Sequence, residues 1–440
     1  MQVTAREAAL IALERCTREG AWSGASIDNI IKKYSLERRE AALAAKICLG
    51  VLQNRSYCDY YIALFYNKAV DKLEVKLLNI LRIGVYQLLF LDKIPARAAV
   101  NETVALCKTS GYGRAAGLVN ALLRKIADSG DNLPEIPGEG TAEYLSVRYS
   151  HPLWMCEKLI SEHGYSHAEQ FFAANNEGAE LCIQVNTIKT SVSDYIAKLE
   201  SENIEYRHDT ALDGCISLSG GNVVDLPGFD EGLFYVQDKA ARTALAIASP
   251  EAGMNVLDCC SAPGGKSFAA AIAMNNSGSI LSCDIHEKKL RLIRSGAERL
   301  GINIIETEAR DARAADESKV DTYDLVIADV PCSGLGVIRK KPEIRNKSAD
   351  ELAGLPEIQK DILERAATFV KCGGVLLYST CTVLSEENEA VVRDFLNKHD
   401  NFVSVEFEIG DVKSEGGMYT FWPHIDGTDG FFAAKLRRIM

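Results

Sequence analysis

Apolar residues recur every three to four positions through the first 127 residues, which is the spacing of one face of an amphipathic helix. The segments with this spacing are Arg6–Cys16, Ala41–Leu52, Val75–Leu91, Asn101–Ser110 and Ala115–Ala127. Runs typical of strands are few in this part of the chain. We therefore predict an all-α helical bundle for residues 1–130.

A stretch rich in glycine and proline follows the predicted bundle, and we expect residues 131–143 to form a linker. Beyond it the pattern is mixed. Leu181–Asn186 alternates like a strand and Val192–Glu202 has helical spacing. These patterns predict a small α/β subdomain over residues 144–240.

From Gly253 onward, short apolar runs alternate strictly with segments of helical spacing. The predicted strands are Met254–Asp258, Ser279–Asp284, Ile304–Glu308, Leu325–Ala328 and Val375–Ser379. Such alternation is typical of a doubly wound parallel sheet, so we predict a Rossmann-like α/β domain over residues 241–440. Two late runs, Phe402–Glu408 and Phe431–Leu436, are expected to add antiparallel edge strands.

Charge is distributed unevenly between these parts. Residues 1–130 hold 19 Lys and Arg against 12 Asp and Glu, a charge of +7, whereas the remainder carries −19. This asymmetry favours a basic recognition module joined to an acidic body, although a solvated helical surface explains the charge equally well.

Cysteine usage and hydropathy limit the class of protein. The 13 cysteines are scattered without a Cys-x-x-Cys pair, which disfavours both a disulfide framework and a zinc site. No apolar run has the length of a membrane span, and the N-terminus lacks the pattern of a signal peptide. We therefore expect a cytoplasmic protein without a metal and without a membrane partner.

Residues with ionisable or nucleophilic side chains lie where predicted strands end. Asp329 directly follows the strand Leu325–Ala328, and the loop after it carries Cys332. Cys381 follows the strand Val375–Ser379. Because ligands bind at the carboxyl ends of parallel strands, we expect both cysteines and Asp329 to face one crevice.

The first strand of the sheet leads into a turn of small residues. They are Cys260, Ser261, Ala262, Pro263, Gly264, Gly265 and Lys266. Small side chains let a ligand approach the backbone, and helix N-terminal amides favour an anionic group. A phosphate-binding P-loop would require glycine at Cys260, so an NTPase is the weaker reading. Asp284 is placed to bind ribose hydroxyls and Asp311 an adenine amino group, which favours an adenosyl ligand.

The predicted bundle resembles the NusB-like RNA-binding domain. The segments that carry this resemblance are Leu36–Arg39, Leu49–Arg55, Ile80–Leu88, Ile94–Glu102 and Val119–Arg124. They recur in order over almost the whole domain, and they imply RNA binding, for which basic side chains supply sequence-independent affinity.

The second half resembles RNA cytosine-C5 methyltransferases in Val256–Lys266, Asp329–Gly334 and Tyr378–Thr382. With the helical domain, the whole chain resembles the bacterial RsmB (Sun) type, which acts on small-subunit (16S) ribosomal RNA. The resemblance implies S-adenosylmethionine as cofactor, Cys381 as nucleophile towards cytosine C6 and Cys332 as an aid to product release. It also implies that Asp329 contacts the cytosine edge and the cofactor region.

Several alternatives stay open at this stage. Spacing alone allows Cys332 to be the nucleophile. Another RNA such as tRNA is an alternative substrate, and a non-catalytic RNA-binding or antitermination factor is an alternative function. The basic run Arg339–Lys347 is read as an RNA backbone contact or, equally, as a solvated loop. We expect a monomer.

Overall fold

The computed structural model describes residues 3–19, 21–66 and 70–440. Contacts divide the chain into two compact units. The first comprises residues 1–177 together with Ile338–Ala349, and the second comprises Gly178–Val337 and Asp350–Met440. The two units group residues by spatial contact and need not coincide with domains. The domain boundaries expected from the sequence therefore stay a prediction.

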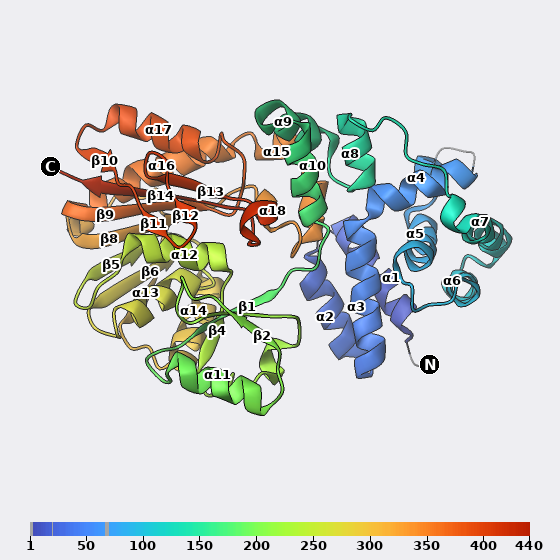
Figure 1. The fold of residues 1–440 in the computed structure, drawn as a ribbon, viewed down its shortest axis with the longest axis horizontal. Coiled ribbons are helices and arrows are strands. Elements are labelled where there is room, and N and C mark those ends of the chain that lie inside the picture. The colour runs from blue at the N-terminus through green and yellow to red at the C-terminus, as the bar shows by residue number, and fades with distance from the viewer. Residues whose placement is uncertain (1–2, 20, 67–69) are drawn as a thin grey trace. The chain divides into compact units, whose positions relative to one another are not determined.

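Helices account for almost all regular structure of the first unit (Figure 1). They are α1 (Ala5–Glu19), α2 (Ser23–Tyr34), α3 (Arg38–Gln53), α4 (Arg55–Tyr66), α5 (Val75–Phe90), α6 (Ala96–Thr109), α7 (Ala116–Ser129), α8 (Ala142–Arg148), α9 (Leu153–His163) and α10 (Tyr165–Ala174). The predicted helical bundle is confirmed.

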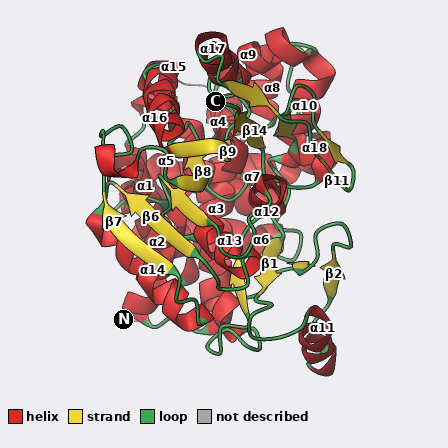
Figure 2. Ribbon diagram, turned by 90° about the vertical axis from the view of Figure 1, so that its left-hand side faces the viewer, coloured by secondary structure: helices red, strands yellow, loops and turns green. Residues whose placement is uncertain are grey.

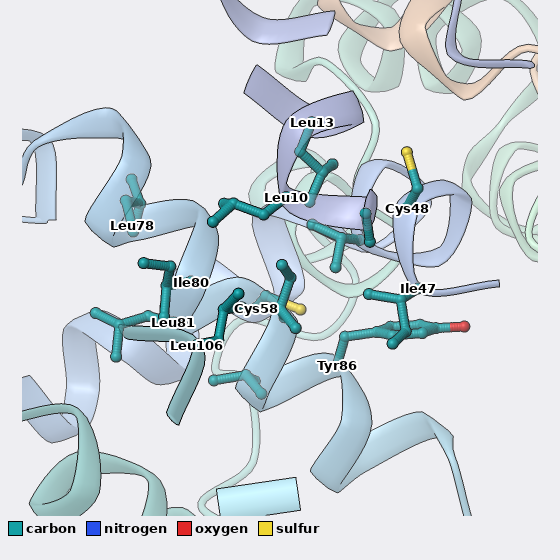
Figure 3. Packing of buried hydrophobic residues seen from close by; sticks show 14 of the residues in the cluster. Leu10, Leu13, Ile47, Cys48, Cys58, Leu78, Ile80, Leu81, Tyr86 and Leu106 are labelled. Carbon is teal, nitrogen blue, oxygen red and sulfur yellow. The ribbon is translucent and has the colours of Figure 1, made fainter. Parts of the chain in front are cut away.

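Helix α5 forms the centre of this bundle because its apolar residues surround its whole circumference. Every residue from Leu77 to Gln87 is buried. Leu10 and Leu13 of α1, Ile47 of α3 and Leu106 of α6 belong to the same apolar cluster (Figure 3). A helix that is hydrophobic all round must be enclosed by other helices, which explains its central position.

The contact between α3 and α5 leaves no room for a side chain at Gly50. A Cβ atom there would lie 2.0 Å from the Tyr86 ring, and Tyr86 is itself buried and stacked on Phe90. We predict that Gly50→Ala lowers the free energy of unfolding by about 1–3 kcal/mol, because overpacking forces the ring to move. Gly117→Ala in α7 is the matched control, since nothing lies within 4 Å of its Cβ position. Thermal unfolding of both variants tests this, and equal effects would contradict it.

The segment Ile338–Ala349 packs into the helical unit although it follows the Cys332 loop in sequence. Arg345 is buried and donates to the carbonyl oxygens of Gln53 and Asn175, at the C-terminal ends of α3 and α10. Glu343 accepts from the backbone N–H (3.2 Å) and hydroxyl (2.5 Å) of Ser23 at the start of α2. Each charge thus lies at the helix end whose dipole it complements. The predicted RNA contact of this run is therefore wrong for Arg345.

The second unit begins with a small antiparallel sheet in the order β2-β3-β1-β4. Its elements are β1 (Leu181–Val185), α11 (Val192–Ser201), β2 (Tyr206–His208), β3 (Cys215–Leu218) and β4 (Phe234–Val236). This is the small α/β part that the sequence predicts.

The large sheet has eight strands, in the order β10-β14-β9-β8-β5-β6-β7 with β13 paired to β14. The strands are β5 (Asn255–Asp258), β6 (Ser279–Asp284), β7 (Ile305–Ala309), β8 (Tyr323–Asp329), β9 (Val370–Thr380), β10 (Phe402–Ser404), β13 (Met418–Phe421) and β14 (Phe431–Arg438). Strands β5 to β9 pair in parallel, whereas β14 runs antiparallel to β9. The predicted antiparallel strands are confirmed, but β14 lies inside the sheet between β9 and β10.

Helices cover both faces of this sheet (Figure 2). One apolar cluster includes residues of α12 (Lys239–Ala248), α13 (Gly265–Ala273) and α14 (Glu287–Leu300). The other includes residues of α16 (Leu355–Phe369) and α17 (Glu389–Lys398). The predicted doubly wound fold is confirmed, and it brings the ends of β5, β6, β8 and β9 to one edge.

Candidate active site

Two cysteines meet at the carboxyl ends of neighbouring parallel strands. Cys332 follows β8 and Cys381 follows β9, and their sulfur atoms lie 3.2 Å apart. Both side chains are half-buried. The hydrogen bond with Cys381, burial and the negative charges of Cys381 and Glu387 raise the pKa of Cys332 well above its usual value. The sequence predicted that these residues share a crevice, and the structure brings their sulfurs into direct contact.

The loop that carries Cys332 is held by backbone bonds at Gly336. The Gly336 N–H donates to the carbonyl of Cys381 (3.0 Å), and its carbonyl accepts from Gly430 N–H (2.8 Å). A Cβ atom at Gly336 would lie 1.8 Å from the Gly430 carbonyl oxygen, so glycine is required for this close approach. The Cys332 loop is therefore fixed against both β9 and the start of β14.

Asp329 at the end of β8 is bound by two side chains. Lys266 Nζ lies 2.7 Å from Asp329 Oδ2, and the Ser379 hydroxyl donates to Oδ1 at 2.7 Å. Lys266 is almost fully buried, and its ammonium lies 4.9 Å from the centroid of the Phe431 ring. A buried cation paired with a carboxylate at the end of a strand can form charge-assisted hydrogen bonds with the polar edge of a ligand.

A cleft of about 340 Å³ opens beside Asp329. Its lining includes Cys260, Ala262, Asp284 and Asp311 from the predicted set, and Ile285 and Ile358 are exposed apolar residues on its walls. A second cavity of about 190 Å³ is lined by Ser261, Pro263, Gly265 and Lys266, and shares Cys260, Ala262 and Asp329 with the first. Gly264 has a φ of 114° in the same turn. All predicted binding residues except Gly264 line one or both of these cavities, and Gly264 lies in the turn between two of the lining residues.

Asp284 and Asp311 occupy different environments within the cleft. Asp284 Oδ1 accepts the backbone N–H of His286 at 2.8 Å, and Lys289 Nζ lies 3.9 Å from it. Asp311 accepts from the guanidinium of Arg313 at 3.1 and 2.7 Å, and these bonds lower its pKa. The Arg313 contact was not expected from the sequence, and a ligand amino group that binds Asp311 must share its carboxylate with Arg313.

Asp258 is a functional candidate that the sequence analysis quoted in a motif but did not single out. It is fully buried at the end of β5 and lines the smaller cavity. Its Oδ2 accepts the Ser267 hydroxyl at 2.7 Å, whereas Oδ1 has no hydrogen-bond partner. Burial raises its pKa to about 7. An acid after the first strand, before a glycine turn, is the signal that could have identified it.

The raised pKa of Asp258 predicts that stability depends on pH. Between about pH 4 and pH 7 the folded state binds a proton here that the unfolded state has lost. The free energy of unfolding should therefore fall as pH rises through this range, by up to about 1.4 kcal/mol per pH unit. Asp258→Asn should remove the part of this decrease in the free energy of unfolding that titration of Asp258 causes. Chemical denaturation of both proteins at pH 5, 6, 7 and 8 measures it, and parallel curves would contradict it.

In the described part of the chain, no group of three or more His, Cys, Asp or Glu side chains could hold a metal ion. None of the helices built from described residues is long and apolar enough to cross a membrane.

Family comparisons cover almost the whole chain. Residues 244–437 match the family described as 16S rRNA methyltransferase RsmB/F, and residues 3–128 match the NusB family. Residues 151–225 match the ferredoxin-like domain of RsmF/B-like methyltransferases.

Curated relatives and solved structures agree with these matches. A Bacillus subtilis protein, named probable ribosomal RNA small subunit methyltransferase B, is 33% identical over 99% of both chains. The Erwinia tasmaniensis ribosomal RNA small subunit methyltransferase B is 31% identical over 94% of each chain. The crystal structure of PH0851 is 28% identical, covers 99% of this chain and 98% of its own, and has a TM-score of 0.83. The chain therefore belongs to the RsmB/F family of methyltransferases, with an N-terminal NusB-like domain.

Proposed function

We propose that the protein transfers a methyl group from S-adenosylmethionine to C5 of a cytosine in 16S ribosomal RNA. The observation that carries this proposal is the pair of sulfurs 3.2 Å apart, which follow the two strand ends joined by the Ser379–Asp329 hydrogen bond. The names of the relatives support ribosomal RNA of the small subunit as the substrate.

The residues of the cleft fit S-adenosylmethionine in shape and charge. The unpartnered Oδ1 of Asp258 suits the cationic ammonium of the methionine part. Asp284 is placed to accept bonds from the ribose hydroxyls, and Asp311 from the adenine amino group. Ile285 and Ile358 provide apolar walls for the purine. When bound, this cofactor supplies an electrophilic methyl group on a sulfonium.

The thiolate of Cys381 is assigned to bond with cytosine C6. This addition breaks the conjugation of the ring and makes C5 nucleophilic, which an unactivated cytosine is not. Cys332 assists the later release of the product, since its sulfur lies next to that of Cys381. Cys260, which does line the cleft, is unsuited to attack because burial and neighbouring carboxylates raise its thiol pKa.

Asp329 and Lys266 are assigned to the cytosine edge. Their paired charges lie on the smaller cavity, where they can hydrogen-bond a base that has been drawn out of its stack. Bonding to the ring nitrogen side stabilises the charge that develops when a thiolate adds to C6. A cytosine in a loop is the favoured target, because less stacking must be broken.

Methyl transfer from labelled S-adenosylmethionine tests the proposal directly. Small-subunit ribosomal RNA, intact small subunits and tRNA are offered separately, and the modified nucleoside is identified by mass spectrometry. We expect 5-methylcytosine from ribosomal RNA, either naked or in the subunit. Modification of tRNA alone would identify tRNA, and not ribosomal RNA, as the substrate. Absence of transfer to all three would favour a non-catalytic RNA-binding protein.

A further inference from the structure

A buried carboxylate lies directly behind the loop that carries Cys332. Glu387 belongs to the turn between β9 and α17, and only 2% of its surface is exposed. Its Oε2 accepts the backbone N–H of Ser333 at 2.8 Å and the side-chain amide of Gln359 at 2.8 Å. The same Gln359 amide donates to the carbonyl of Pro331 at 3.0 Å. The backbone is thus held on both sides of Cys332.

The same network reaches the strand that carries Cys381. The Tyr378 hydroxyl, in β9, donates to the backbone carbonyl of Glu387 at 2.6 Å. The hydroxyls of Ser333 and Thr382 lie 2.7 Å apart, which joins the residues that follow the two cysteines. Because Glu387, Ser333, Gln359, Tyr378 and Thr382 are all buried, the network fixes the position of each sulfur relative to the other.

The charge of Glu387 is not balanced by a cation. Among the residues that the structure describes, no Lys, Arg or His forms an ion pair with it, and its Oε1 accepts no hydrogen bond. An uncompensated carboxylate disfavours a second negative charge nearby. Its charge contributes to the raised pKa of Cys332.

Because the two sulfurs are in contact, the charge of Glu387 can affect which of them is protonated. When one proton is lost from the pair, the remaining proton is shared between the sulfur atoms of Cys332 and Cys381. Tyr378 is a further titratable group near Cys332 and Glu387, and burial keeps it protonated by raising its pKa. Glu387 is bonded to the residue next to Cys332, so its charge lies on the Cys332 side of the pair.

We propose that Glu387 is a positioning residue that holds the proton on Cys332, so that the thiolate resides on Cys381. This inference rests on the proposed function, because it assigns a cause to the division of labour between the two cysteines. The Cys332 S–H then donates to the sulfur of Cys381, both before attack and when that sulfur leaves C6.

Site-resolved alkylation measures the protonation of each cysteine without RNA or cofactor. The full chain with Cys381→Ser is treated with iodoacetamide between pH 6 and 11, and the Cys332 peptide is quantified by mass spectrometry. We expect Glu387→Gln to lower the midpoint of Cys332 alkylation by about one pH unit. Glutamine is isosteric and keeps an oxygen acceptor for the Ser333 N–H, so the variant removes mainly the charge.

Glu389→Gln is the matched control. It removes the same charge two residues further on, where the carboxylate accepts from the Thr420 hydroxyl at 2.9 Å. Its midpoint should equal that of the parent. An unchanged midpoint in Glu387→Gln, or an equal fall in Glu389→Gln, would overturn the inference.

Alkylation of the wild-type chain provides a second test if Glu387→Gln fails to fold. Cys381 should react at lower pH than Cys332, and the opposite order would also overturn the inference. Neither measurement depends on methyl transfer, so failure of the proposed function would be seen separately in the RNA assay.

Discussion

Replacing Cys381 by alanine should abolish methyl transfer, with kcat falling at least about a thousandfold, because no other group can bond to C6. Cys332 lies 3.2 Å away but is expected to retain its proton. The measurement is the rate of transfer of labelled methyl to small-subunit ribosomal RNA. Cofactor binding should be unchanged, since Cys381 lines neither cavity.

Cys332→Ala should give the opposite behaviour. Attack by Cys381 and methylation proceed, but the product stays attached, so an RNA–protein adduct should accumulate to about one per enzyme and resist denaturation in a gel. Cys372→Ala is the control, because Cys372 is exposed in β9 and takes no part in the site. An adduct in Cys381→Ala with none in Cys332→Ala would make Cys332 the nucleophile.

Lys266→Met should reduce kcat/KM for RNA about a hundredfold, the cost of removing one preorganised charge from a reacting centre. Methionine fills the same volume against Phe431 but leaves Asp329 without its cation. The charge of Lys266 also lowers the pKa of Asp258. Its loss should therefore raise the pKa of Asp258 further and move the lower limb of the pH–rate profile to higher pH.

Lys289→Met provides the comparison within the same cleft. Lys289 lies 3.9 Å from Asp284 but its side chain is half exposed, so water screens its charge. We expect a loss of less than about threefold and no shift of the pH profile. Equal losses in the two variants would argue that net charge in the cleft matters, and not the Lys266–Asp329 pair.

Sequence predicted those features of the site that follow from local pattern. The strands that end in Asp258, Asp284 and Asp329 are short apolar runs, and the parallel sheet places their ends at one edge. Cys332 and Cys381 could be paired because each follows such a strand. The turn Cys260–Lys266 could be recognised because small residues and glycines mark a close approach of backbone to ligand.

The network behind Cys332 could not be predicted in this way. Glu387 lies in an acidic stretch before a helix, a pattern more typical of an exposed helix start. Its burial depends on Gln359 in α16, 28 positions away, and on the backbone of Ser333. Long-range partners of this kind leave no periodic signal.

Arg345 illustrates a second limit of prediction from sequence. A run with five basic residues reads as a surface, yet this guanidinium lies inside the helical unit, and burial lowers its pKa to about 9. Two of its partners are backbone carbonyl oxygens at helix ends, which any sequence provides, and the third is the side-chain oxygen of Asn176. Only the folded chain shows where such oxygens converge.

The path of Ile338–Ala349 has a practical consequence for dissecting this protein. No single cut yields both compact units intact, because a fragment that begins at residue 178 carries this segment without the helices that enclose it. Pro342, Ile344 and Arg345, all buried in the whole chain, would then be stripped of their surroundings. A fragment lacking residues 1–177 should therefore be prone to aggregation, and co-expression of the two pieces should restore solubility. The two units are interleaved in sequence, so a chimaera that exchanges one of them must also accommodate this segment.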